Sequence, residues 1–191
     1  KTETSIPFAV SGSVDPYIIQ RNSVRYMGDT YFKPYALKNL EVIAKSKWKF
    51  WFNPKIVIAG MTKRIEAVYS ETPLALGVGI YGIYHFAGYD PKYLLGILNS
   101  RFLTFYLNYK FKDKHLAGGY LAINKGTIEK LPFIEATLEQ QVKLVKLIDQ
   151  IMVLKKNDPD SEIANLQHEI DEIVYKIFNL TREEIAIVES S

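Results

Sequence analysis

The chain has 191 residues, of which 48% are hydrophobic and 24% charged, a balance typical of a globular protein. Its longest apolar runs are far shorter than the ~20 residues of a membrane-spanning helix, so we expect no transmembrane span. The sequence contains no Cys. This excludes disulfides and thiolate metal sites and favours a cytoplasmic location.

Charge is divided unevenly along the chain. Residues 1–134 contain 18 Lys and Arg against 9 Asp and Glu, whereas residues 135–191 contain 6 against 12. A basic region attracts polyanions such as nucleic acids, and an acidic region is repelled by them. We therefore predict a basic domain at 1–134 and an acidic tail at 135–191. From composition alone, an ordinary solvated surface explains the same asymmetry equally well.

The N-terminal part of the chain is expected to be irregular. Residues 6–35 are rich in turn-forming residues, which predicts loops and short strands. Residues 36–45 have the apolar spacing of a short helix. In the basic run that follows, aromatic residues alternate as in a strand that faces the core: Trp48, Phe50 and Phe52.

The middle of the chain predicts a sheet followed by a helix. Residues 56–59, 65–69 and 76–84 are rich in β-branched and aromatic residues, which favours an antiparallel meander. Asp90-Pro91 then has the form of a helix start, an Asp cap before a first-turn Pro, and the apolar periodicity continues to about Tyr109. We expect this helix to pack on the sheet.

The C-terminal part has strong helix signals. Residues 122–123 and 128–133 predict short strands or turns, and the sequence from Thr137 to Gln140 is a capping box. We predict two helices, the second beginning at Ser161, and a third, short helix capped by Thr181. The apolar faces of the first two are predicted to contain Leu138, Val142, Val145, Ile148 and Met152, and then Ile163, Leu166, Ile170, Ile173, Val174 and Ile177.

These elements predict an α+β fold, a twisted antiparallel-rich sheet with flanking helices followed by a C-terminal helical hairpin. The segment at 93–133 joins an apolar helix, a basic aromatic loop and a Gly-Gly turn in one order. Four further landmarks mark the chain: Leu98-Asn99-Ser100, Gly118-Gly119-Tyr120, Leu131-Pro132-Phe133 and Pro54-Lys55-Ile56-Val57.

The order and spacing of these landmarks, with the helical sequence at 170–188, resemble the TaqI-like C-terminal specificity domain. This is the target recognition domain of type IIG restriction-modification enzymes and of related adenine-specific DNA methyltransferases. The resemblance covers nearly the whole chain. It implies sequence-specific binding of duplex DNA, and a tail that packs on the recognition domain or on the methyltransferase.

Two basic clusters are candidates for phosphate contacts. Lys and Arg side chains contact phosphates, and a Gly pair allows the backbone to approach a groove. The first cluster contains Lys45, Lys47, Lys49 and Lys55, and the second contains Lys110, Lys112, Lys114 and His115 followed by Gly118, Gly119 and Tyr120. We expect charge reversal of Lys112 and Lys114 to weaken DNA binding.

Base reading needs shorter hydrogen bonds, from Arg or Lys to guanine and from Asn or Gln to adenine. The candidates are Arg25, Lys63, Arg64, Gln20, Asn22 and Asn124. Ordinary structural explanations compete with these interpretations. The lysines suit a solvated face and the Gly-Gly-Tyr turn a tight loop without a ligand. Leu98-Asn99-Ser100 is best interpreted as a helix signature in which Asn99 satisfies nearby backbone.

The sequence offers little for catalysis. The histidines, His85, His115 and His168, are far apart without metal-ligand spacing, and Asp160 with Glu162 lacks the partner strand of a nuclease motif. There is no Asn-Pro-Pro-Tyr motif for adenine methylation and no Gly-rich loop for S-adenosylmethionine. We therefore predict no catalysis, cofactor or metal in this chain.

Because the chain does not begin with Met, we expect it to be a piece of a longer polypeptide. The resemblance implies that S-adenosylmethionine and Mg²⁺ belong to upstream methyltransferase and nuclease domains, which would be its partners besides duplex DNA. The sequence is also compatible with two other functions. One is a protein-interaction or dimerisation module that uses the C-terminal helical hairpin, and the other is a freestanding nuclease.

Overall fold

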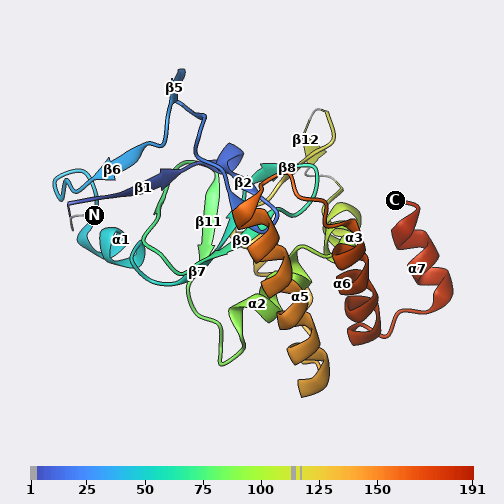
Figure 1. The fold of residues 1–191 in the computed structure, drawn as a ribbon. Helices are drawn as coiled ribbons and strands as arrows, with labels where there is room; N and C mark the ends of the chain where they lie inside the picture. Colours follow the sequence, from blue (N-terminus) through green and yellow to red (C-terminus); the bar gives the residue numbers. More distant parts are fainter. Residues whose placement is uncertain (1–3, 113–114, 117) are drawn as a thin grey trace.

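Short strands and helices form two regions of the molecule in the computed structural model, which describes residues 4–112, 115–116 and 118–191. The strands lie together, and the C-terminal helices gather beside them (Figure 1). This confirms the predicted α+β class and the C-terminal helical region. No helix in the part of the chain that is described is long and apolar enough to cross a membrane.

The N-terminal strand β1 (Ser5–Ala9) lies between two partners in a small mixed sheet. It pairs antiparallel with β6 (Tyr35–Leu37) and parallel with β10 (Ala75–Leu76). Residues 36–45 were predicted to be helical, and this is wrong. Leu37 belongs to β6, and the helix starts only at Lys45, after turns at 39–43.

A second sheet forms the centre of the fold. Its order is β11-β7-β9, with β7 (Lys55–Ala59) antiparallel to both β9 (Ala67–Ser70) and β11 (Ile80–Ile83). The strands were predicted correctly as antiparallel, but the order is not that of a meander. Each residue of β7 is buried. A strand covered on both faces belongs in the middle of a sheet, which explains why β7 takes the central position.

The basic aromatic run is helical, which contradicts the predicted strand. Helix α1 (Lys45–Phe50) buries Trp48, and Trp51 is buried just after its end. The two indole rings meet edge to face at 5.8 Å between centroids. Spacing of three residues places both on one face of a helix. Phe50 lies off this face, where its ring contacts that of Tyr84 and 44% of the residue remains exposed.

The long helix predicted after Asp90 is divided in two. Asp90 caps α2 (Pro91–Leu98) as expected, by accepting a hydrogen bond from the Lys92 amide. The helix ends at Asn99, and Ser100 then caps α3 (Arg101–Lys110) by accepting from the Leu103 amide. Helix α2 packs against β7 and β9, which confirms that this segment covers the sheet.

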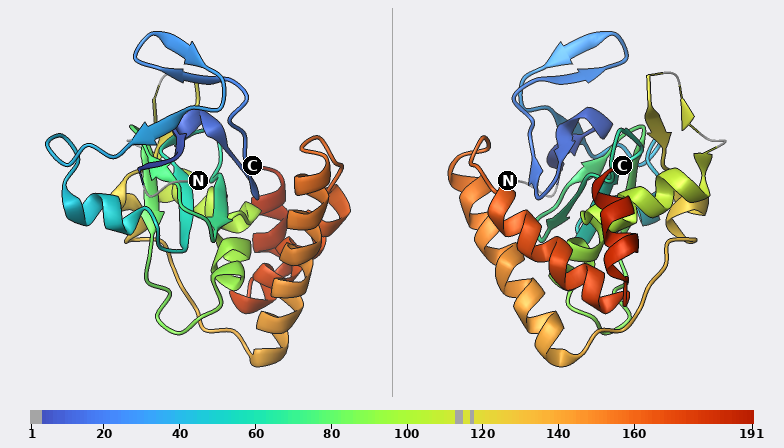
Figure 2. Two further views of the ribbon diagram at one scale, coloured as in Figure 1. Left: turned by 60° about the vertical axis from the view of Figure 1, so that its left-hand side comes forward. Right: turned by 90° about the vertical axis from the view of Figure 1, so that its right-hand side faces the viewer.

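Two hairpins project from the same end of the molecule (Figure 2). One consists of β4 (Val24–Tyr26) and β5 (Asp29–Tyr31). The other is β12 (His115–Leu116) and β13 (Tyr120–Ala122), extended by β8 (Met61–Thr62) in the order β12-β13-β8. The remaining small elements are η1 (Ser11–Ser13), β2 (Val14–Asp15), β3 (Ile18–Ile19) and α4 (Lys125–Ile128), the last of which replaces part of the predicted strand or turn at 128–133.

The tail contains α5 (Leu138–Asn157), α6 (Ala164–Ile177) and α7 (Arg182–Glu189). The capping boxes at Thr137 and Thr181 are confirmed. Ser161 does not begin α6; its hydroxyl instead donates to carbonyls at the end of α5. The predicted apolar face is correct for α6 and partly correct for α5. Ile148 is buried and Val145 and Met152 pack against the core, but Leu138 and Val142 are exposed. Helix α5 also buries Leu144, Leu147 and Ile151.

One core joins the tail to the rest of the fold. It contains Ile56 and Ile58 of β7, Leu95 of α2, Ile148 of α5 and Val174 of α6. A second core packs Trp48 of α1 and the following Trp51 against the other face of the sheet. Because α5 and α6 contribute to the larger core, they pack on the predicted recognition domain; the boundary at residues 134 and 135 remains a prediction.

Lys55, the first residue of β7, is a charged residue in the interior of the fold. Its side chain is fully buried, and its ammonium has no hydrogen-bond partner among the described residues. Burial lowers the pKa of Lys55 to about 8. The folded protein therefore binds the Lys55 proton more weakly than the unfolded chain does.

We predict that Lys55→Met raises the free energy of unfolding at pH 7 by about 1–3 kcal/mol, because a neutral chain of similar length needs no hydration. The advantage should shrink as pH rises from about 8 towards the usual Lys pKa, since the wild type then loses its buried charge. Urea unfolding of both proteins at pH 7 and pH 9.5 measures this. An advantage that is independent of pH would contradict a buried, titrating amine.

Candidate nucleic-acid interface

Pairing of β8 with β13 brings together candidate residues that are distant in sequence. Thr62 lies opposite Leu121 in this pair. Lys63 follows β8 and Tyr120 begins β13, and the Lys63 ammonium lies over the Tyr120 ring, 5.7 Å from its centroid. The amine and the ring form a basic, aromatic surface of the kind that contacts phosphates and stacks on bases.

The Gly118-Gly119 turn at the tip of this hairpin depends on backbone conformation. The φ angles of Gly118 and Gly119 are +81° and +78°. A Cβ at Gly119 would meet nothing within 4 Å, so the requirement for Gly there is conformational rather than steric. The turn is exposed, and it presents its backbone next to Tyr120.

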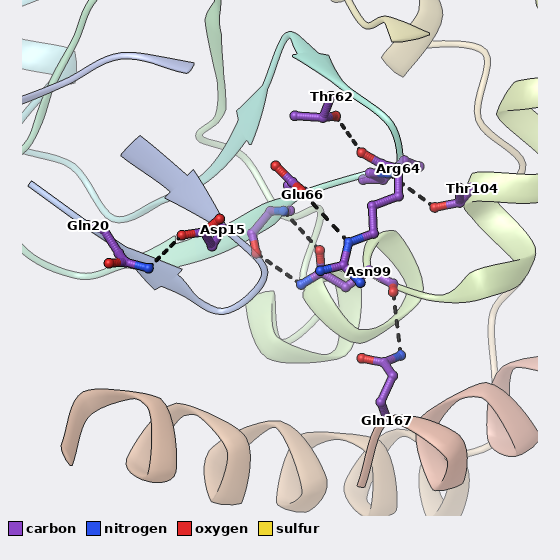
Figure 3. Close-up of polar contacts among 10 residues, drawn as sticks. Asp15, Gln20, Thr62, Arg64, Glu66, Asn99, Thr104 and Gln167 are labelled. Carbon is purple, nitrogen blue, oxygen red and sulfur yellow. Dashed lines mark hydrogen bonds and ion pairs between the residues drawn. The ribbon is translucent and has the colours of Figure 1, made fainter. Parts of the chain in front are cut away.

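The loop between β8 and β9 is held in place by the break between α2 and α3 (Figure 3). The Asn99 side chain accepts from the Ala67 amide and donates to the Ala67 carbonyl, both at 2.9 Å. Thr104 of α3 accepts from the Ile65 amide at 3.1 Å. These contacts confirm the structural role predicted for Asn99. They also fix the loop that carries Lys63 and Arg64 to the rigid core.

Arg64 remains accessible at this loop. Its guanidinium is 3.7 Å from the Glu66 carboxylate, and 64% of the Arg64 side chain is exposed. Burial raises the pKa of Glu66, while nearby Arg64 acts in the opposite direction. Exposed ion pairs of this kind contribute at most about 1 kcal/mol. The pair therefore orients Arg64 without preventing its contact with a phosphate.

A polar groove of about 1260 Å³ runs between this loop and the tail. Lys63, Arg64 and Tyr120 contribute to one wall. Asp160 and Glu162, in the turn between α5 and α6, contribute to the other. Charges of both signs line the groove, because Asp15 and Glu66 accompany Lys63 and Arg64, and Lys155 accompanies Asp160 and Glu162.

The β4–β5 hairpin adds exposed apolar residues that the sequence analysis did not select. Met27 and Gly28 form its turn, both with positive φ, and Met27 is 84% exposed. Tyr31 and Phe32 are also exposed at the hairpin. Arg25, a predicted base-reading residue, is exposed on β4. The Gly28-Asp29 break was the only sequence signal for this turn, and it gave no indication that the hairpin projects.

The other predicted residues are distributed over the surface and the core. Lys47 and Lys49 are exposed on α1, at a distance from the β12 hairpin (Figure 1). Lys110 and Lys112 are exposed where α3 leads into that hairpin. Lys114 lies outside the described residues, and of His115 only the backbone in β12 is described.

Three predicted residues have structural roles instead. Lys55 is buried, so the structure removes it from the candidate phosphate contacts. The Asn124 side chain caps α4 by accepting from the Thr127 amide. Gln20 donates to the Asp15 carboxylate at 2.8 Å. Asn22, in contrast, is exposed.

Comparison with known families identifies the family of the chain. The model of the TaqI-like C-terminal specificity domain matches residues 14–133, more than half of the chain. The chain therefore belongs to this family. Membership gives it a DNA sequence-specificity role in a restriction-modification enzyme, as the resemblance implied. No curated protein matches the sequence.

We predict that Asn99→Ala lowers the free energy of unfolding by about 2–4 kcal/mol, because the Ala67 amide loses its partner in a buried position. The exposed Asn22→Ala is the matched control and should change stability by less than about 0.5 kcal/mol. Urea denaturation of both variants measures the difference. Equal stability of the two would show that Asn99 does not anchor β9.

Proposed function

We propose that this chain is the target recognition domain of a type IIG restriction-modification enzyme or an adenine-specific DNA methyltransferase, and that it reads a short sequence in duplex DNA. Residues 14–133 support this through the family match. The chemistry of methyl transfer and cleavage belongs to other domains in this proposal. The recognition domain holds the duplex while the target adenine is flipped into the methyltransferase pocket.

The observation that carries the proposal is the pairing of β8 with β13. It places Lys63 beside Tyr120, which follows the Gly118-Gly119 turn, and Arg64 is the next residue along the chain. In our proposal the cations bind phosphates and set the register, while exposed side chains of the two hairpins approach base edges. The acidic excess of residues 135–191 favours an approach of DNA from the hairpin end, away from α5 and α6.

Charge reversal tests the assigned surface. We predict that Lys63→Glu with Lys112→Glu weakens DNA binding by about ten- to a hundredfold and reduces the dependence of affinity on salt. Both side chains are exposed, so the fold should be unaffected. Fluorescence anisotropy with a labelled duplex across a salt series measures both quantities.

The matched control is Lys143→Glu with Lys146→Glu, two exposed lysines of α5. It changes the net charge of the protein by the same amount on the tail. If both double variants lose affinity equally, the effect comes from net charge alone, and the assigned surface is wrong.

Selection from a randomised duplex library tests the function itself. The purified chain is incubated with the library at low and near-physiological salt, and the retained DNA is sequenced. We expect an enriched short motif. Retention without a motif that vanishes as salt rises would reduce the proposal to non-specific binding by a basic surface. No retention at either salt would contradict it.

A second function is favoured by one observation, the exposed apolar residues of α5. Leu138, Val142 and Val153 are 77%, 61% and 59% exposed, and their spacing places them on one face of the helix. We infer that this face docks on a neighbouring domain of the same polypeptide. A mass that rises with concentration in analytical ultracentrifugation, together with no DNA affinity, would instead favour a dimerisation module.

A further inference from the structure

Three potential metal ligands meet between helices α6 and α7. His168 and Glu172 are one turn apart on α6, and Glu189 is the last residue of α7. One donor atom from each side chain, an imidazole nitrogen and two carboxylate oxygens, lies within 4.8 Å of the others. His168 and Glu189 also line the polar groove. None of the three side chains has an ion-pair or hydrogen-bond partner within the described parts of the chain.

A buried hydroxyl group next to this cluster is an independent indication of a ligand. Tyr175 is only 1% exposed, and its oxygen has no hydrogen-bond partner among the residues described. Burying a hydroxyl without a partner is unfavourable. A water molecule bound to a cation at the cluster would supply the missing partner by donating a hydrogen bond to the Tyr175 oxygen.

Helix geometry aims this hydroxyl at the cluster. Tyr175 is three residues after Glu172 and seven after His168, so the three share one stripe of α6. Long side chains on a helix point back towards its N-terminus, over the preceding turn. Burial, followed by the nearby carboxylates of Asp171 and Glu189, raises the pKa of Tyr175 to about 12. The hydroxyl thus lies within electrostatic range of α7 as well.

We propose that His168, Glu172 and Glu189 bind a Zn²⁺-like divalent cation that joins α7 to α6. Zn²⁺ accepts an imidazole nitrogen with carboxylate oxygens at ~2.0–2.2 Å, and three protein ligands leave a fourth position for water. Ligand atoms around such an ion lie ~3.3–3.6 Å apart. Rotation of the three side chains that moves each donor atom by roughly 1 Å would bring the donors to this spacing.

The donor set selects among cations. Mg²⁺ and Ca²⁺ prefer oxygen ligands alone, whereas imidazole with carboxylate suits Zn²⁺ and its first-row neighbours. The Tyr175 hydroxyl accepts from the metal-bound water or donates to a ligating carboxylate, and so orients the site. No metal site was predicted because the histidines lack metal-ligand spacing along the sequence. The fold brings acidic residues to His168 that this spacing does not reveal.

Titration of the metal-free 191-residue chain with ZnCl₂ by isothermal calorimetry tests the site. The protein carries no affinity tag and is treated with EDTA beforehand. We expect one Zn²⁺ per chain, a raised melting temperature, and no measurable heat with MgCl₂. His168→Gln and Glu189→Gln should each weaken Zn²⁺ binding ~tenfold or more, and Tyr175→Phe by a smaller factor.

The matched controls are His85→Gln and Glu183→Gln, which remove an exposed histidine and an exposed α7 carboxylate outside the cluster. These should bind Zn²⁺ as the wild type does. The proposal is overturned if the wild type shows no saturable binding, or if His168→Gln binds as tightly as His85→Gln. Circular dichroism of each variant confirms that it is folded. None of these outcomes depends on DNA binding, so the metal site and the recognition function fail separately.

Discussion

The two hydrogen bonds between Asn99 and the Ala67 backbone set the frame of this domain. They join the break between α2 and α3 to the first residue of β9, at 2.9 Å for each bond. The Ala67 carbonyl also accepts from the Tyr17 amide at 2.9 Å. A strand, a helix break and the N-terminal region thus meet at one residue, Ala67. The loop of Lys63 and Arg64 begins only a few residues away, so its position follows from this contact.

The tail extends the same polar network. Gln167 of α6 accepts a hydrogen bond from the Tyr17 hydroxyl at 2.7 Å. Asp171 accepts from the Arg101 amide, an otherwise unpaired group at the start of α3. Burial raises the pKa of Asp171, and the hydrogen bond from the Arg101 amide opposes this shift. Although the tail is acidic and the preceding domain basic, the two are joined by a common core and by buried hydrogen bonds. The division of charge therefore does not mark a division between parts that fold separately.

Sequence reasoning succeeded where the signal is local. The helix starts at Asp90, Thr137 and Thr181 depend on a cap and on residues within one turn, and all three are confirmed. It failed where the same residues fit both the two-residue period of a strand and the 3.6-residue period of a helix. The aromatics from Trp48 to Phe52 match both a strand and a helix, and packing of the two tryptophans on the sheet decides for the helix. The apolar residues of α5 occupy two faces, and contact with α2 selects one of them. Leu144 packs closely against Gly96, where a Cβ would come within 2.9 Å.

The candidate interface was less accessible to sequence reasoning because it is made by a pairing distant in sequence. Nothing local indicates that Lys63 lies over Tyr120. The structure separates candidates by what else their side chains do. Asn124 is bound to a helix end, and Lys55 is buried. Recruiting either would break a hydrogen bond or expose the core, and DNA contacts would have to compensate for that cost. Lys63 and Lys112 have no such commitment. Both side chains are exposed, so a phosphate could reach them without any rearrangement of the fold, and for this reason the proposal places recognition at the end of the molecule that carries the two hairpins.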